Sequence, residues 1–273
     1  MLPLVLALLA VPHPSVLSSF SKVGPNPAIA ARSPGTARAV VLIHGLGIYP
    51  FNAAKVVKPS LRSWQHPTSP LVKALSVGSD VFAFAYSQTA AAHKIHDAAE
   101  LALHVKKLKA DGYKEIVLVG HSAGGLVARH LVEDHPDCGA TRVVQVCAPN
   151  LGSAWAIIRT RREAQGEFVA SLSKTSRGKV LAERTDKKLP ASLEFVCLVG
   201  SCRLNGDGVV GLASQWSEDL QKQGVPAVVV GCGHKDILTS TKGIEAIAKA
   251  TGEPAPRWTA DKVATGRKAV FGK

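Results

Sequence analysis

Short apolar runs alternate with segments of helical spacing along most of this 273-residue chain. The apolar runs, rich in β-branched residues, occupy 39–44, 80–86, 115–120, 141–148, 193–199 and 226–231. Helical patterns occupy 71–76, 90–109, 123–133 and 238–250. Continuously apolar strands are typical of parallel sheets that are covered on both faces. We therefore predict an α/β fold, with a mostly parallel central sheet and helices on both faces.

Composition divides this fold into three parts. Hydrophobic residues make up 46% of the chain, which excludes a disordered protein and permits one large core. We predict an N-terminal segment and linker over 1–37, the folded domain over 38–252, and a mobile basic C-terminal tail over 253–273. Residues 150–191 break the alternation of strands and helices, and we expect a helical cap to be inserted there.

The first eleven residues, MLPLVLALLAV, are almost entirely apolar. They are too few to span a bilayer, which takes about 20 residues. Their length suits a signal peptide, although no Lys or Arg precedes them and the candidate cleavage site at 28–30 lies far downstream. An N-terminal strand or a mis-called start codon is the alternative. We favour export, to the periplasm or the medium, over a cytoplasmic location.

The hexapeptide GHSAGG at 120–125 joins a predicted strand directly to a predicted helix. A serine on such a sharp turn has strained backbone angles, and the glycines on either side permit the close approach that the turn needs. The turn exposes the hydroxyl of Ser122 above the sheet. The N–H of Ala123 points to the same space from the start of the helix. We predict that Ser122 is a nucleophile.

A serine hydroxyl needs a base, and the base needs an orienting acid. His234 follows the last predicted strand, and no other histidine lies after His135. Asp207 lies between Ser122 and His234, in a loop that follows the strand at 193–199. The other acids are less well placed. Asp236 is too close to His234 in sequence, Glu163 and Glu167 belong to the predicted cap, and Glu194 precedes its strand.

The loop after the first predicted strand reads HGLG at 44–47. A developing oxyanion needs two preorganised donors, and we assign them to the N–H groups of Leu46 and Ala123. We call the turn at 120–125 the elbow. We expect the substrate pocket to be lined by residues from the 44–47 loop, the elbow, the loop that carries Asp207 and the start of the cap. These residues are His44, Gly45, His121, Leu151, Trp155 and Val209.

These motifs resemble those of the α/β-hydrolase superfamily, specifically its lipase and carboxylesterase branch. The resemblance runs from about 39 to 250 and includes HGLG, GHSAGG, the VAR that follows, APNLGS at 148–153, DGVV at 207–210 and the late GH. These motifs look like those of bacterial triacylglycerol-type lipases and of the related deacylases of lipid anchors. Carried over by motif, the resemblance implies a triad of Ser122, Asp207 and His234, with Leu46 and Ala123 as oxyanion donors.

Two departures from the pattern leave the substrate open. Ala123 stands where many lipases have a larger Met or Gln, and Asn150 begins an NLGS segment where such lipases often carry a His. The resemblance implies a serine hydrolase that cleaves carboxylic esters, of lipids or other acyl groups, through an acyl-enzyme and without a cofactor. An acyltransferase with the same triad and a catalytically silent binding member of the fold stay open as alternatives.

The basic charge is unevenly spread. Lys plus Arg number 33 against 20 Asp plus Glu, for a net charge of +13, and no acid precedes Asp80. The predicted cap adds nine bases and four acids. This distribution suggests transient contact with an anionic membrane or lipid interface. Without a basic helix carrying base-reading residues, and with only 5% aromatic residues, the sequence predicts no nucleic-acid binding.

The cysteines and the remaining histidines give weaker signals. Five cysteines are no disulfide framework, although Cys202 and Cys232 each follow an apolar run and their pairing stays open. His93 and His96 share one helix face, with His104 beyond them. No downstream cysteine or acidic cluster completes a ligand set, so we expect ordinary helix surface there and no metal site.

Overall fold

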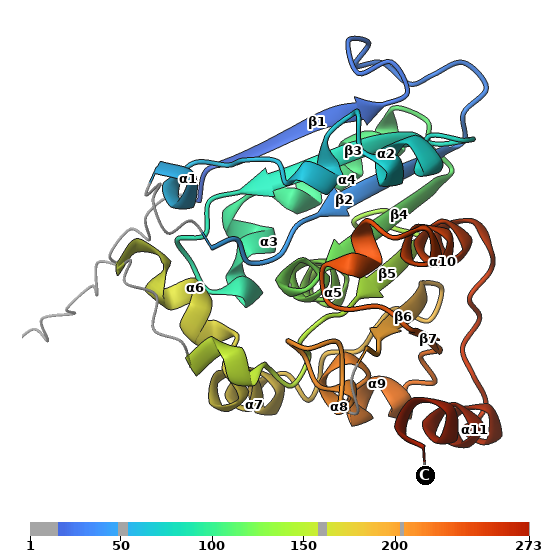
Figure 1. Cartoon of the computed structure of the whole chain (residues 1–273). Coiled ribbons are helices and arrows are strands. Elements are labelled where there is room, and N and C mark those ends of the chain that lie inside the picture. Colours follow the sequence, from blue (N-terminus) through green and yellow to red (C-terminus); the bar gives the residue numbers. More distant parts are fainter. Residues whose placement is uncertain (1–15, 49–53, 158–162, 203–204, 273) are drawn as a thin grey trace, which may run out of the picture.

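A seven-stranded sheet in the order β1-β3-β2-β4-β5-β6-β7 forms the centre of the protein (Figure 1). The computed structural model describes residues 16–48, 54–157, 163–202 and 205–272. The strands are β1 Ser18–Gly24, β2 Arg38–Ile43, β3 Asp80–Tyr86, β4 Glu115–His121, β5 Arg142–Val146, β6 Glu194–Gly200 and β7 Ala227–Val230. Only the β1–β3 pair is antiparallel among these strands. The mostly parallel sheet predicted from the apolar runs is confirmed.

Helices cover both faces of the sheet, as predicted (Figure 1). One apolar core joins the sheet to α4, α5 and α11, and the other joins it to α2 and α10. The inner strands are buried along nearly their whole length, which explains their mostly apolar sequence. The helices are α1 Ala54–Val57, α2 Pro70–Leu75, α3 Ile95–Ala98, α4 Leu101–Ala110, α5 Ala123–Asp134, α6 Gly166–Ser171, α7 Lys174–Glu183, α8 Leu212–Gln215, α9 Glu218–Lys222, α10 Thr241–Gly252 and α11 Ala260–Phe271.

The single helix predicted over 90–109 is broken. A 3-10 turn at Ala92–Lys94 leads into the one-turn helix α3, and α4 begins only after Glu100. Glu100 has a φ of 54°, in the left-handed region that interrupts a helix. The N–H of Ala92 donates to the Ser171 hydroxyl of α6, at 2.9 Å, so this end of the segment is bound to the cap.

The cap lies between β5 and β6 and is helical, as expected. Its described elements are the 3-10 turns Ala154–Ile157 and Glu163–Gln165 and the helices α6 and α7. Arg177 of α7 is fully buried and donates from Nε to the Asn150 carbonyl at 3.1 Å. Its Nη1 donates to His130 Nε2 of α5, also at 3.1 Å. The cap is therefore fastened to the helix that begins beside Ser122.

The C-terminal region differs from the expected mobile tail. Residues 260–271 form α11, and Phe271 stacks on Trp216 with ring centroids 6.0 Å apart. Trp258, just before the helix, meets the same Trp216 ring edge-on. The expectation of a mobile tail is wrong for these residues, because the apolar side chains of α11 fall on one helix face and cover Trp216.

Near the N-terminus, β1 pairs with β3 as an edge strand. The apolar stretch that suggested a signal peptide lies within residues 1–15, outside the described part of the chain. Residues 28–30, the candidate cleavage site, lie in the connection between β1 and β2. No helix in the described residues is long and apolar enough to cross a membrane.

Candidate active site

Ser122 occupies the turn between β4 and α5. Its φ of 55° and ψ of −127° are strained for a residue with a side chain, and its N–H donates to Val146 O of β5 at 2.8 Å. Neighbouring glycines make the turn sterically feasible: a Cβ on Gly120 would lie 2.4 Å from Gly124 O, and one on Gly124 would lie 2.2 Å from Ile43 O. The fold thus presents Ser122 at the carboxyl end of the parallel strands, where ligands bind in such sheets.

Asp207 and His234 meet at the same end of the sheet. His234 Nδ1 lies 2.7 Å from Asp207 Oδ2, while Asp207 Oδ1 accepts from the N–H groups of Val209 and Val210 at 2.8 and 2.7 Å. Burial raises the pKa of Asp207, but the bonds from His234 and the two N–H groups outweigh it and lower the pKa below its usual value. The ionised carboxylate holds the proton on Nδ1, which leaves Nε2 of His234 free to act as a base.

His121 joins the His234 loop to the elbow. Its Nε2 lies 2.8 Å from the carbonyl oxygen of His234, and the two rings are 4.7 Å apart between centroids. Burial, and then the nearby His234, lower the pKa of His121 to about 3. His121 is therefore neutral and donates to that carbonyl. This contact holds His234 against the turn that carries Ser122, but His121 is 93% buried and has little surface to offer a substrate.

The loop predicted to supply the second oxyanion donor lies against the elbow. A Cβ on Gly45 would lie 2.6 Å from Ser122 Cβ and 3.0 Å from Ala123 N, so only glycine allows this approach. The Ala123 N–H is in the first turn of α5, where helix N–H groups have no intrahelical partner. Leu46 follows Gly45 and is half-buried.

Two buried glutamines that sequence reasoning missed hold this loop. The Gly47 N–H donates to Gln88 Oε1 at 2.9 Å, and Gln165 Nε2 donates to Gly47 O at 2.8 Å. Gln165 also donates to Gln88, at 2.9 Å. Gln165 belongs to the cap and Gln88 lies just after β3, so the cap and the segment that follows β3 together fix the loop. The only sequence signal for this role was the position of Gln88, two residues after the carboxyl end of a strand, where functional residues gather in such sheets.

His44 does not line the pocket. It is fully buried, accepts at Nε2 from the Tyr86 N–H at 3.2 Å, and donates from Nδ1 to Gly45 O at 2.9 Å. Burial, and then the charge of Arg62, lower the pKa of His44 to about 3. The prediction of His44 as a pocket residue is wrong, because both ring nitrogens bind backbone beneath the site.

Three of the predicted pocket residues lie nearer the surface. Leu151 is 37% exposed and Trp155 is 59% exposed, and Val209 is half-buried. Ser153 connects two of them, because its hydroxyl donates to Val209 O at 2.6 Å and accepts from the Trp155 N–H at 3.1 Å. Ile48, just past the loop of Leu46, is 72% exposed. Apolar side chains are thus available on both the cap side and the loop side.

Gln215 is a further residue that sequence reasoning missed, and it supports the loop of Asp207. Its Oε1 accepts from the Gly200 N–H at 2.7 Å, and its Nε2 donates to Val210 O at 2.9 Å. Gly200 is closely packed: a Cβ there would lie 2.7 Å from Cys147 Sγ and 2.9 Å from Asp207 Cβ. Nothing in the sequence around Gln215 marks this role.

Among the described residues, two groups of side chains of metal-ligand type lie close together. In one, Cys147 lies with Asp207 and His234, all ligand atoms within 4.8 Å. Burial, and then Asp207, raise the pKa of Cys147 well above its usual value, so the thiol stays protonated and is a poor ligand. The other group is His96, Asp97 and His135. His96 is buried and bonded to Asp134 at 3.0 Å, so the expectation of ordinary helix surface is wrong for it.

The cysteines form no disulfide. All five lie in the described residues and are free thiols, including Cys202 and Cys232. Cys232 instead lies 3.3 Å from the Ser240 hydroxyl.

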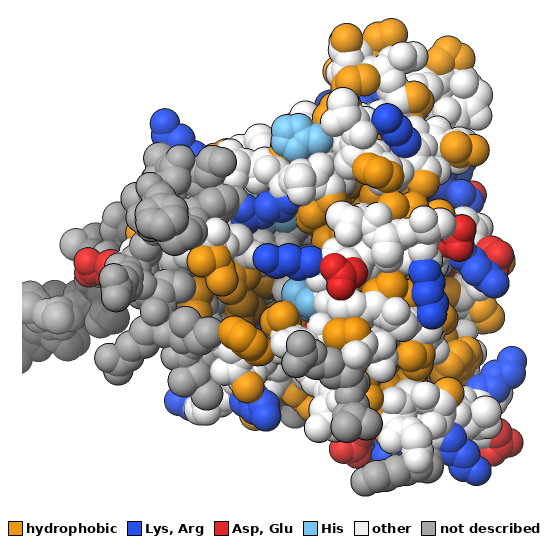
Figure 2. Space-filling model, viewed as in Figure 1, with side chains coloured by type: hydrophobic (Ala, Val, Ile, Leu, Met, Phe, Trp, Pro, Cys, Tyr) orange, Lys and Arg blue, Asp and Glu red, His pale blue; other side chains and the backbone are white. Residues whose placement is uncertain are grey.

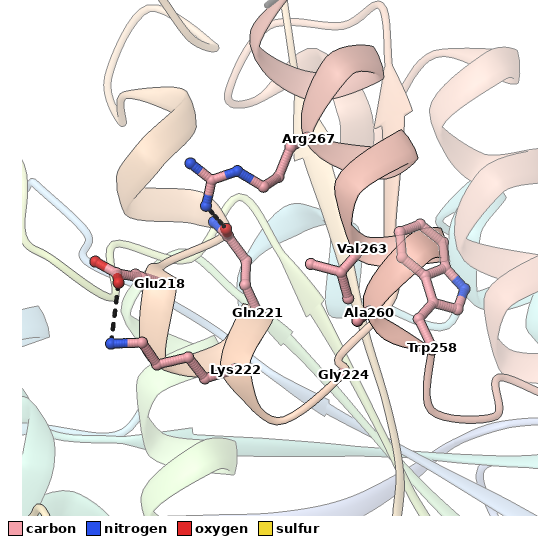
Figure 3. A pocket seen from close by; sticks show the side chains of 8 residues that line it. All are labelled: Glu218, Gln221, Lys222, Gly224, Trp258, Ala260, Val263 and Arg267. Atoms are coloured by element: carbon pink, nitrogen blue, oxygen red, sulfur yellow. Dashed lines mark hydrogen bonds and ion pairs between the residues drawn. The ribbon is translucent and has the colours of Figure 1, made fainter.

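A groove lies between α9 and α11, apart from the candidate catalytic residues (Figure 3). The polar side chains that line the groove pair with one another. Glu218 forms an ion pair with Lys222 at 2.9 Å, and Arg267 donates to Gln221 at 2.6 Å. The groove contains none of the candidate catalytic residues. It is lined by Glu218, Gln221, Lys222, Gly224, Trp258, Ala260, Val263 and Arg267.

A strained serine between strand and helix, with a hydrogen-bonded Asp–His pair at the same end of a mostly parallel sheet, is the arrangement of an α/β hydrolase. The sequence model of the alpha/beta hydrolase family matches residues 40–261, and the chain belongs to that family. Among curated proteins, no match is found.

Solved structures with this fold include several lipases and esterases. The propeptide form of the Bacillus licheniformis lipase BlEst2 superimposes with a TM-score of 0.64 at 14% identity, over 89% of this chain and 55% of that one. The Legionella pneumophila phospholipase PlaB gives 0.61 at 16% identity, over 86% and 64%. A monoacylglycerol lipase from Paleococcus ferrophilus gives 0.54 at 16%, over 86% and 98%. The chain thus spans little more than half of the first of these proteins. At these identities the structural likeness shows the fold alone.

Proposed function

We propose that this protein is a serine hydrolase that cleaves carboxylic esters, with lipid or other acyl esters as substrates. The observation that carries the proposal is the 2.7 Å bond between His234 Nδ1 and Asp207 Oδ2 beside a strained Ser122. That pair is held from three sides, by the N–H groups of the acid's own loop, by His121 and by Gln215. Such rigid support is what a preorganised base requires.

In the first half of the reaction, His234 Nε2 takes the Ser122 proton while Oγ attacks the ester carbonyl. The carbonyl oxygen becomes an oxyanion and accepts hydrogen bonds from the N–H groups of Ala123 and Leu46. Asp207 stabilises the imidazolium of His234. When the intermediate collapses, the C–O bond of the ester breaks and the alcohol leaves with the proton from His234.

In the second half, water replaces the alcohol. His234 takes a proton from the water as its oxygen attacks the acyl carbonyl, and the same N–H groups hold the second oxyanion. Collapse breaks the bond to Ser122 Oγ, which recovers its proton from His234. The carboxylic acid is released and the enzyme is regenerated. An acyltransferase would differ only in admitting an alcohol in place of water.

The surface favours an apolar acyl group and an anionic interface. Ile48 and Trp155 expose apolar side chains, and the face shown in Figure 2 carries Lys and Arg side chains between hydrophobic ones. Arg62 lies against the oxyanion loop, with Nη2 3.4 Å from Gly45 O. Apolar groups beside basic ones suit transient binding to anionic lipid. Activity on anionic vesicles should then fall sharply as salt rises, while activity on soluble neutral esters should not.

The test is hydrolysis of p-nitrophenyl esters from acetate to long-chain acyl. Ser122→Ala should abolish turnover and labelling by a fluorophosphonate while the circular dichroism spectrum is unchanged. Ser19→Ala, at an exposed serine of β1, is the matched control and should retain full activity. A Ser122→Ala protein with wild-type turnover contradicts the proposal. Wild-type protein that fails to react with the probe would be a silent member of the fold. Acyl transfer to an added alcohol in preference to water would identify an acyltransferase.

A further inference from the structure

Three side chains of metal-ligand type meet where α3 and α5 end. His96 and Asp97 belong to α3, and His135 directly follows α5. One ligand atom from each lies within 4.8 Å of the others. His135 Nε2 is 2.5 Å from Asp97 Oδ1, and His96 Nε2 is 3.4 Å from Asp97 Oδ2. The histidine pair His93 and His96 lacked partners in sequence, but the fold brings an imidazole from another helix to His96.

We propose that His96, Asp97 and His135 bind one Zn²⁺ ion or a similar transition-metal dication. Zn²⁺ binds imidazole nitrogen and carboxylate oxygen at about 2.0–2.2 Å, which separates the ligand atoms of a tetrahedral site by about 3.3 Å. The two separations from Asp97 oxygens, 2.5 and 3.4 Å, lie on either side of that value, and the ligand atoms of the two imidazoles lie within 4.8 Å of each other. Two nitrogen ligands favour zinc, cobalt, nickel or copper over calcium and magnesium, which prefer oxygen alone.

The three ligands combine rigidity with access. The His96 side chain is only 2% exposed, whereas those of His135 and Asp97 are 33% and 60% exposed. One ligand is therefore fixed in the protein, while the other two face solvent and can close on an ion. His135 is also the C-cap of the 12-residue helix α5, whose carboxyl end carries partial negative charge that favours a cation.

The neighbouring charges decide the number of protein ligands. Asp134 Oδ2 lies 3.0 Å from His96 Nε2, but Asp134 is already paired with Arg184 and Lys187. We therefore assign three protein ligands and a water molecule in the fourth position. Each imidazole must present an unprotonated Nε2 to the ion. A neutral ring with its proton on Nε2, as in His96 when it donates to Asp134, moves that proton to Nδ1, and a protonated ring releases one proton to solvent.

Such a site would join α3 to the carboxyl end of α5, the helix that begins beside Ser122. Its effect would be on stability, and it does not depend on the proposed ester hydrolysis. The readouts are therefore metal stoichiometry and thermal unfolding of the full chain, with no substrate present.

The experiment is a Co²⁺ titration of chelator-treated, dialysed protein, followed by Zn²⁺ competition and thermal unfolding. We expect visible absorption bands of tetrahedral Co²⁺ that saturate at one equivalent and disappear on adding Zn²⁺. Saturating Zn²⁺ should raise the unfolding temperature by about 5 °C. His135→Gln and Asp97→Asn, both at the solvent-facing ligands, should lose the bands and the temperature rise. His66→Gln, at an exposed histidine elsewhere, should keep both.

Three results would overturn the proposal. The first is the absence of Co²⁺ bands in the wild-type protein at tenfold excess. The second is binding that survives His135→Gln but is lost in His234→Ala, which would assign the ion to Asp207, His234 and Cys147. The third is an equal temperature rise with Mg²⁺ or Ca²⁺, which would indicate unspecific binding of cations.

Discussion

The edge strand β1 is anchored by a buried ion pair whose loss should be costly. Lys22 Nζ lies 3.0 Å from Asp80 Oδ1, and the two side chains are 1% and 0% exposed. Breaking a buried pair from one side costs about 3–5 kcal/mol, because an unpaired charge is left behind. In Lys22→Met, the Asp80 carboxylate would keep its bonds from Ser33 N at 2.8 Å, Ser33 Oγ at 2.6 Å and Tyr113 OH at 2.5 Å. We therefore take the lower end and expect a loss of about 3 kcal/mol in the free energy of unfolding.

Urea unfolding at pH 7, followed by circular dichroism, measures this loss of free energy, and thermal unfolding measures the matching shift of the unfolding temperature. Lys22→Met should lower the unfolding temperature by about 8 °C, whereas Lys73→Met, at an exposed lysine of α2, should change stability by less than about 0.5 kcal/mol. The double variant Lys22→Met/Asp80→Asn should recover most of the loss, since no buried charge remains. A loss below about 1 kcal/mol in Lys22→Met would refute the reasoning.

The pH dependence gives an independent check on the same pair. Burial raises the pKa of Asp80, but bonds from Ser33, Tyr113 and Lys22 outweigh it and lower the pKa below its usual value. A carboxyl group with a lowered pKa stabilises the fold above its unfolded value, and the contribution is lost as pH falls through the folded value. The difference between wild type and Lys22→Met should therefore shrink below about pH 4.

Other variants test the site and the cap. Gly45→Ala should reduce kcat on p-nitrophenyl esters about 100-fold with the fold intact, because its Cβ would lie 2.6 Å from that of Ser122 and displace the oxyanion loop; wild-type kcat would contradict this. Gln165→Ala removes the 2.8 Å bond to Gly47 and should lower kcat about tenfold with little change in KM, so an effect on KM alone would argue against it. Burial raises the pKa of Glu133, but bonds and charges from His130 and Arg129 outweigh it and lower the pKa to about 2. Stability from Glu133 should therefore be lost as pH falls from about 4.5 to 2, and urea midpoints for Glu133→Gln should not show that component.

The ion pair of Lys22 also bears on where a leader could be removed. Cleavage at residues 28–30 would take away β1 and Lys22, and would leave Asp80 without its cation. We therefore expect any leader to end before Ser18. N-terminal sequencing of exported protein measures this directly, and a mature chain that starts after residue 30 would contradict it.

The strands were predictable because each one carries its own signal. The run at 80–86 matches β3 at both ends, since every residue of that strand is buried and the six residues after Asp80 are apolar. The prediction of Ser122, Asp207 and His234 as catalytic residues used the same signal, because each follows the end of a predicted strand. The edge strand β1 was missed because its pattern alternates between exposed and buried positions, and its stability comes from β3, about 60 residues away.

Other features depend on contacts that no local pattern records. Gln88 and Gln165 become loop supports only because the cap folds over the end of β3. His44 looked accessible in a glycine-rich loop, yet its ring lies parallel to that of Tyr86, with centroids 4.3 Å apart, beneath the site. The basic composition of 253–273 masked the single apolar face of α11, because charge on the outer face of a helix gives no information about its inner face.

The basic charge of the cap has two different uses in this fold. Arg177 is fully buried against α5, and Arg184 pairs with Glu133 and Asp134 at 3.1 and 3.0 Å. Both arginines hold the cap in place, so they contribute little to attraction at long range. Exposed lysines such as Lys174, Lys179 and Lys188 remain for an anionic interface. The excess positive charge of the sequence therefore overstates the electrostatic attraction for lipid, and substitution of these lysines, rather than of the arginines, separates binding at the interface from the architecture of the cap.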